Sequence, residues 1–130
     1  MKKVYGVCST GYLHLQLNYN TMAVTLTSDS CLFLQVAQHD RVILRYHTDD
    51  CGEPCTKFIP IYDQVSEDPK YKNIVFLSVD GEQNAMANKR ILTELQPVIT
   101  IYFKGRLLDS SYTSTKEGLE ELLEELCKTV

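Results

Sequence analysis

Apolar and polar residues alternate in blocks along the chain, and the blocks predict strands and helices in turn. Short, mostly apolar runs, typical of strands buried in a sheet, lie at 23–26, 42–46, 74–79 and 98–103, and a further strand is expected at 107–111. Between and after them, apolar residues recur at helical spacing and predict four helices, which begin near Cys31, before Phe58, at Gln83 and after Ser114. The order is therefore strand and helix in alternation, closed by two strands and a last helix.

This order predicts an α/β fold with a mixed central sheet and helices on both of its faces. The turn-like segment Lys104-Gly105-Arg106 joins the last two strands as an antiparallel hairpin. Pro60 lies inside the second helix, where it removes one N–H donor and predicts a kink. Ser114 and Glu117 have the spacing of a capping box, so they predict the start of the last helix.

The first 21 residues do not follow this regular pattern. Leu13, Leu15 and Leu17 alternate with polar residues, which is a strand signal. A second strand-like start comes directly after Met22. We therefore expect an N-terminal extension at 1–21, either an added hairpin or sequence upstream of the true initiator, and one domain at 22–130.

Charge and hydropathy narrow the choice of partners. The 130 residues carry a formal net charge of −4, which argues against nucleic acid or an anionic membrane as the main partner. No stretch approaches the ~20 apolar residues that a membrane-spanning helix needs. The N-terminus also lacks the continuous apolar core of a signal peptide. The expected location is therefore a reducing cytoplasm.

The chemistry of the chain is expected in the segment Cys51-Gly52-Glu53-Pro54-Cys55, between the strand at 42–46 and the helix that follows. The N-terminus of that helix directs unsatisfied N–H groups at the first thiol and favours its thiolate, the form that attacks disulfides. The other three of the five cysteines have no metal-like spacing and are interpreted as buried or incidental thiols: Cys8, Cys31 and Cys127.

From about Met22 onward the chain resembles the thioredoxins. The segment 51–55 contains the Gly-Pro-Cys half of the family's Cys-Gly-Pro-Cys motif, and the segment 60–63 matches its helix-kinking proline and the residues after it. Pro97 stands where the family keeps a cis-proline that packs beside the disulfide and shapes the substrate groove. The resemblance implies a thioredoxin-like fold. It also implies substrate contacts at four residues: Pro97, Gln96, Gly52 and Pro54.

The sequence departs from the family pattern at several residues that are expected to affect thiol–disulfide exchange. Glu53 adds a third residue between the cysteines, so the pair is expected to meet only through a bulged first helical turn. Asp50 stands where the family usually has tryptophan, and its carboxylate opposes thiolate formation. Arg45 and Phe76 align with the family's buried aspartate and its coupled lysine, so the usual proton relay is missing. Two roles stay open for Arg45: reaching the surface, which we prefer, or lowering a thiol pKa by its charge.

The resemblance implies thiol–disulfide exchange on protein or peptide disulfides, without a bound cofactor. Cys51 is expected to attack the substrate and Cys55 to resolve the mixed disulfide. Electrons would come from a reductase or a small thiol. The rival hypothesis is a redox-poor module that binds a protein or peptide partner in the groove beside Pro97. His47 is a minor candidate for a general base, and no metal is expected at the cysteines.

Overall fold

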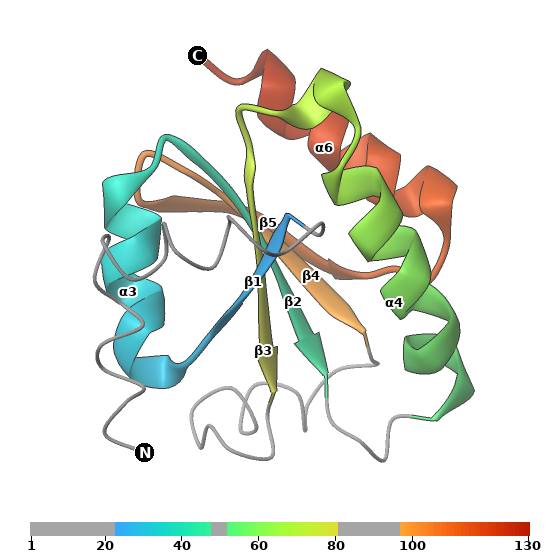
Figure 1. The fold of residues 1–130 in the computed structure, drawn as a ribbon. Coiled ribbons are helices and arrows are strands. Elements are labelled where there is room, and N and C mark those ends of the chain that lie inside the picture. Colours follow the sequence, from blue (N-terminus) through green and yellow to red (C-terminus); the bar gives the residue numbers. More distant parts are fainter. Residues whose placement is uncertain (1–22, 48–51, 81–96) are drawn as a thin grey trace.

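Five strands of the chain pair into one mixed sheet in the computed structural model, which describes residues 23–47, 52–80 and 97–130 (Figure 1). Their order across the sheet is β1-β3-β2-β4-β5. The strands are β1 (Val24–Thr27), β2 (Arg41–His47), β3 (Val75–Asp80), β4 (Val98–Phe103) and β5 (Arg106–Tyr112). The helices are α3 (Asp29–Gln38), α4 (Glu53–Ser66) and α6 (Lys116–Lys128), with a short 3-10 turn, η2 (Pro69–Tyr71), after α4.

The mixed character of the sheet follows from its connections. β1 and β2 both run parallel to β3, because helices carry the chain back between successive strands. β4 runs antiparallel to β2 and to β5. Lys104 and Gly105 form the hairpin turn with positive φ angles of 50° and 82°. This turn is one residue shorter than predicted, because Arg106 already pairs with Phe103.

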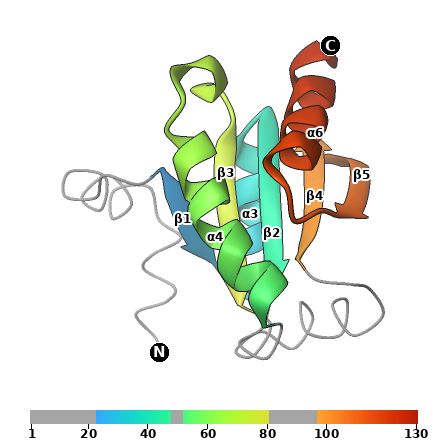
Figure 2. The same ribbon diagram turned by 90° about the vertical axis from the view of Figure 1, so that its right-hand side faces the viewer.

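Helices cover both faces of the sheet, as the sequence predicts. α3 lies on one face, and α4 and α6 lie together on the other (Figures 1 and 2). Each face has its own apolar core: Val36 of α3 packs with Val42 and Leu44, whereas Phe58 and Tyr62 of α4 pack with Ile43 and the leucines of α6. The predicted α/β architecture, with a mixed sheet between helical layers, is confirmed.

The structure tests some of the predictions made for single helices. Pro60 lies inside α4, which continues through it from Glu53 to Ser66. The predicted capping box at Ser114 is wrong by one residue: Thr115 is the N-cap of α6, and its hydroxyl accepts a hydrogen bond of 3.0 Å from the Gly118 N–H. The helix predicted at 83–91 and the extension at 1–21 lie outside the described residues.

Candidate functional site

Three segments that carry predicted site residues meet at the carboxyl end of β2. β2 ends at His47, and α4 begins nearby at Glu53. β4 begins at Val98, which lies opposite Tyr46 in the antiparallel ladder. Pro97, directly before β4, is buried and accepts a hydrogen bond of 3.3 Å from the Thr113 N–H. The fold therefore brings Pro97 to the sheet edge at which α4 starts.

Cys55 occupies the first turn of α4. Its side chain is 4 % exposed and takes part in a disulfide bond. The other half of that bond lies outside the described residues, as do three of the predicted site residues: Cys51, Asp50 and Gln96. Cys55 begins the buried stripe of α4, which continues through Phe58 and Tyr62 toward the sheet. The Cys55 sulfur is therefore shielded from solvent by the helix and the sheet.

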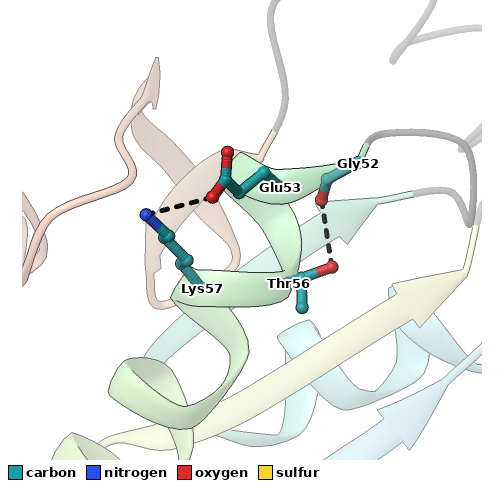
Figure 3. Close-up of polar contacts among 4 residues, drawn as sticks. All are labelled: Gly52, Glu53, Thr56 and Lys57. Carbon is teal, nitrogen blue, oxygen red and sulfur yellow. Dashed lines mark hydrogen bonds and ion pairs between the residues drawn. The ribbon is translucent and has the colours of Figure 1, made fainter.

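The start of α4 is regular, although a bulged turn was predicted there. The Thr56 N–H donates to the Gly52 carbonyl at 3.1 Å, which is the ordinary bond of an α-helical turn. The Thr56 hydroxyl donates to the same oxygen at 3.1 Å, and Glu53 pairs with Lys57 at 3.2 Å (Figure 3). The added Glu53 is thus an exposed residue of a first turn that is regular from Gly52 to Thr56, whereas the part of the predicted bulge at Cys51 lies outside the described residues.

The unusual backbone lies one residue earlier, at Gly52. This residue is the N-cap of α4 and has a φ of 87°, a left-handed conformation that glycine adopts without a steric penalty. Pro54 then occupies the first turn of the helix, where a missing N–H leaves no hydrogen bond unmade. Gly52 and Pro54 therefore fix the backbone conformation with which α4 begins.

Arg45 is buried, so the preferred prediction that it reaches the surface is wrong. Its side chain is 6 % exposed on the face of β2 that α4 covers. The guanidinium Nη2 donates to the Ser78 hydroxyl at 2.9 Å, and its central carbon lies 4.8 Å from the centroid of the Tyr62 ring. Desolvation lowers the pKa of Arg45, while Tyr62 and Asp63 act in the opposite direction. The other two guanidinium nitrogens, Nε and Nη1, are buried without a hydrogen-bond partner among the described residues.

Tyr62 links the helix to the sheet beneath it. Its hydroxyl lies within hydrogen-bond distance of two backbone carbonyls, that of Ile43 at 3.2 Å and that of Leu77 at 2.7 Å. Complete burial raises the pKa of this phenol well above its usual value, because a phenolate would lose its hydration. Tyr62 is therefore a neutral hydrogen-bond donor that fixes α4 over β2 and β3.

His47 ends β2 and is partly buried, as sequence reasoning expects for a histidine at a strand end. It lies opposite Asp80 in the parallel ladder between β2 and β3. Within 23–47, 52–80 and 97–130, no group of three or more histidine, cysteine, aspartate or glutamate side chains is arranged to hold a metal ion. In the same residues, no helix is long and apolar enough to cross a membrane.

Cys31 is the residue that sequence reasoning missed. It is buried in α3, which agrees with one of the two alternatives, but it is disulfide-bonded and therefore not a thiol, and its partner lies outside the described residues. Cys127, in contrast, is a free and exposed cysteine near the end of α6. In the sequence, the odd number of cysteines is the signal that at least one of them stays unpaired. The spacing of the cysteines does not show which ones pair, because disulfide partners can be distant in sequence.

Comparison with known proteins places this arrangement among the thioredoxins. The family model described as Thioredoxin matches residues 23–126. Thioredoxin of Equus caballus is 29% identical over 93 residues, which cover 72% of this chain and 86% of that protein.

Solved structures give the same result for the fold. Thioredoxin f from spinach chloroplast superimposes with a TM-score of 0.72 at 21% identity, covering 84% of this chain and 98% of that one. A chain in a solved complex of ferredoxin:thioredoxin reductase with thioredoxin f2 is 27% identical, with a TM-score of 0.69. That match covers 82% of this chain and 97% of the other.

Proposed function

Because the chain belongs to the thioredoxin family, we propose that it is a thiol–disulfide oxidoreductase that acts on protein or peptide disulfides. The family relationship supports this activity in general terms. The observation that carries the proposal for this chain is Cys55, a buried and disulfide-bonded cysteine in the first turn of α4. A cysteine pair that forms a disulfide at a helix N-terminus has the chemistry that exchange requires.

In the proposed reaction, Cys51 attacks and Cys55 resolves. The Cys51 thiolate attacks one sulfur of the substrate disulfide, which breaks that bond, forms a mixed disulfide and releases one substrate thiolate. Cys55 then attacks the Cys51 sulfur, so the second substrate thiol leaves and a Cys51–Cys55 disulfide forms. Two electrons pass from the protein to the substrate, and the substrate sulfurs take up protons from solvent or from the protein. A dithiol donor restores the reduced pair by the reverse exchange.

The remaining elements of the proposal concern substrates and partners. Pro97 supports a substrate contact, because it is buried beside the end of β2, close to where α4 begins. Gly52, Pro54 and Gln96 complete the proposed contact surface. A reductase is the proposed electron donor, supported by the likeness to a chain solved in complex with ferredoxin:thioredoxin reductase. The proposed location is the cytoplasm, where a reductase or small thiols would keep the pair reduced.

A reductase-free assay tests the activity. The reduced protein, freed of excess dithiol, is mixed with a protein disulfide such as insulin, beside Cys51→Ser and Cys55→Ser variants. We expect the parent chain to reduce the substrate, Cys51→Ser to be inactive, and Cys55→Ser to accumulate a mixed disulfide without turnover. Cys127→Ser is the matched control, since it removes an exposed free cysteine, and its rate should equal that of the parent. Equal background rates for the parent and both site variants would refute the oxidoreductase proposal.

The rival function is a thioredoxin-fold module that binds a partner without redox turnover. One observation favours it: a buried arginine occupies the position at which the family's proton relay is expected. In this case the Cys51→Ser, Cys55→Ser and parent chains would all bind an extended peptide with the same affinity, and none would reduce a disulfide. Peptide titration by fluorescence anisotropy beside the reduction assay separates the two functions.

A further inference from the structure

Arg45 is a buried cation beneath α4, and no described residue places a countercharge at hydrogen-bond distance from it. Arg45 is 6 % exposed, and only its Nη2 makes a hydrogen bond, to the neutral hydroxyl of Ser78. Its Nε and Nη1 find no acceptor among the described residues. Buried N–H groups are rarely left in this state, because each loses its hydration without compensation. In this oxidised form the site therefore has donors available for an anion.

Among the described residues around Arg45, none places an anion in contact with the guanidinium. Tyr62 faces the guanidinium as a neutral ring at 4.8 Å, with its hydroxyl turned to backbone carbonyls. Asp63 is half-buried on α4 and acts on Arg45 only through space. β3 contributes Ser78 and β4 contributes Ile99 opposite Arg45, and His47 follows two residues later on β2. None of these neighbours supplies a carboxylate at hydrogen-bond distance from Nε or Nη1.

Reduction of the disulfide creates an anion on the same side of the sheet. Arg45 and Ile43 lie on the face of β2 that α4 covers, and Cys55 begins the buried stripe of that helix. Seven residues separate Cys55 from Tyr62, which is about 10 Å along the helix axis at about 1.5 Å per residue. Helical side chains lean toward the helix N-terminus. The Tyr62 ring therefore lies closer to Cys55 than the Tyr62 backbone does, and the Arg45 guanidinium stacks on that ring.

We propose that the Arg45 guanidinium is the electrostatic partner of the Cys55 thiolate in the reduced protein, and that it thereby makes the disulfide of this chain more oxidising. The proposal rests on the proposed function, in which Cys51 and Cys55 form the exchanging pair. Reduction by a dithiol breaks the S–S bond of the pair and transfers two electrons, and the donor's two sulfurs become a disulfide. At a pH above the lowered pKa of Cys55, Arg45 allows the Cys55 sulfur to remain a thiolate, so reduction of the pair takes up one proton fewer than it would with a neutral residue at position 45.

The effect is large enough to measure. A unit charge about 10 Å away, in a protein of effective dielectric constant about 20, shifts a thiol pKa by about one unit. A shift of one unit corresponds to about a tenfold change in the equilibrium between the dithiol and a glutathione disulfide buffer. The same charge makes the reduction potential fall less steeply with pH over the range in which Cys55 is a thiolate, because one proton fewer accompanies the two electrons.

Arg45→Met tests the proposal, with Arg41→Met as the matched control. Arg41 lies on the same strand, but its guanidinium donates to the Leu126 and Thr129 carbonyls at the far end of α6. In a Cys51→Ser background, the pH dependence of Cys55 alkylation, located by peptide mapping, gives the thiol titration directly. We expect Arg45→Met to raise the Cys55 pKa by about one unit, and Arg41→Met and Arg45→Lys to leave it near the parent value. An unchanged titration in a folded Arg45→Met variant overturns the proposal.

A stability measurement distinguishes this role from simple packing. Arg45→Met should raise the urea midpoint of the oxidised protein, because it removes an uncompensated buried charge. It should lower the midpoint of the reduced protein at a pH where Cys55 is a thiolate. A purely structural arginine would move both midpoints in the same direction, and that result overturns the proposal. The Cys55 titration does not require turnover, so an inactive parent chain would refute the proposed function and leave this test intact.

Discussion

Burial under α4 changes the pKa values of two residues of this chain, Arg45 and Tyr62. Arg45 and Tyr62 both lie between β2 and α4, and burial alters the two in opposite ways. The buried guanidinium loses hydration while it remains charged, so its pKa falls. The buried phenol stays neutral and donates to the sheet, so its pKa rises. The neutral Tyr62 hydroxyl stabilises the folded state near pH 7 through its hydrogen bonds. The buried charge of Arg45 destabilises the folded state when no anion lies beside it.

Tyr62→Phe should change both the stability and its pH dependence. Below pH about 10, the pKa of an exposed tyrosine, the neutral Tyr62 contributes its hydrogen bonds in full, and its loss should cost about 1 kcal/mol. Because its folded pKa is raised, the parent loses this contribution as the pH rises above about 10. Urea unfolding at pH 7 and at several values above pH 10 measures this. We expect a shallower alkaline decline in Tyr62→Phe, and an identical decline in both chains would contradict the assignment.

At the scale of the element, helix ends decide geometry that apolar periodicity leaves open. α4 begins with a left-handed Gly52 and continues as a regular turn through Glu53. α6 begins at Thr115, whose hydroxyl accepts from the Gly118 N–H. The start of α4 is fixed by the backbone conformation of Gly52, and the start of α6 by the hydrogen bond of Thr115. Moving either helix start by one residue would leave the apolar stripe of the helix almost unchanged, so the stripe does not reveal the exact start.

Thr115→Ala tests the observed cap, and Ser114→Ala is its control. Removing an N-cap hydroxyl leaves a helical N–H without its acceptor and should lower the free energy of unfolding by about 1 kcal/mol. Ser114 precedes the cap, and its hydroxyl accepts only from the exposed Tyr112 hydroxyl, at 3.2 Å, so Ser114→Ala should have a much smaller effect. Urea denaturation of the two variants gives the comparison. A larger loss from Ser114→Ala would restore the capping box predicted from the sequence.

At the scale of the whole molecule, the cysteines fall on both faces of the sheet. Cys31 belongs to α3 and Cys55 to α4, which lie on opposite faces, so these two disulfide-bonded residues are not partners of each other (Figure 1). Cys127 is free. Of the five cysteines, Cys8 and Cys51 are then left as partners. We therefore expect two disulfides in the oxidised chain, one that holds Cys31 of α3 and one that holds Cys55 of α4.

Thiol labelling of the unfolded chain tests this count. Alkylation without prior reduction should modify Cys127 alone, and after reduction all five cysteines should react. Graded reduction followed by peptide mapping should open the Cys55 disulfide before that of Cys31, if the former is the exchanging pair. Alkylation of Cys31 in the unreduced chain would contradict the bond in α3. Alkylation of Cys51 without reduction would contradict its pairing with Cys55.

Much of the fold was predictable because its signals are local. The apolar runs at 42–46, 74–79 and 98–103 identified the central strands, and the alternation with helices implied layers on both faces. Exact helix ends were less predictable, since Ser114 and Thr115 are both capping residues and the capping-box spacing favours Ser114, whereas the geometry of the turn selects Thr115.

The sequence by itself determined the fold class and the family, because strand and helix periodicity and the ordered prolines and cysteines are readable along the chain. Only the tertiary structure decided that Arg45 is buried beneath Tyr62 and beside Ser78, and that Cys31 belongs to a disulfide. Those properties depend on residues far apart in sequence, which packing brings together. The sequence gives the type of each side chain, but the packing of the helices on the sheet determines how far that side chain is hydrated and which residues it contacts.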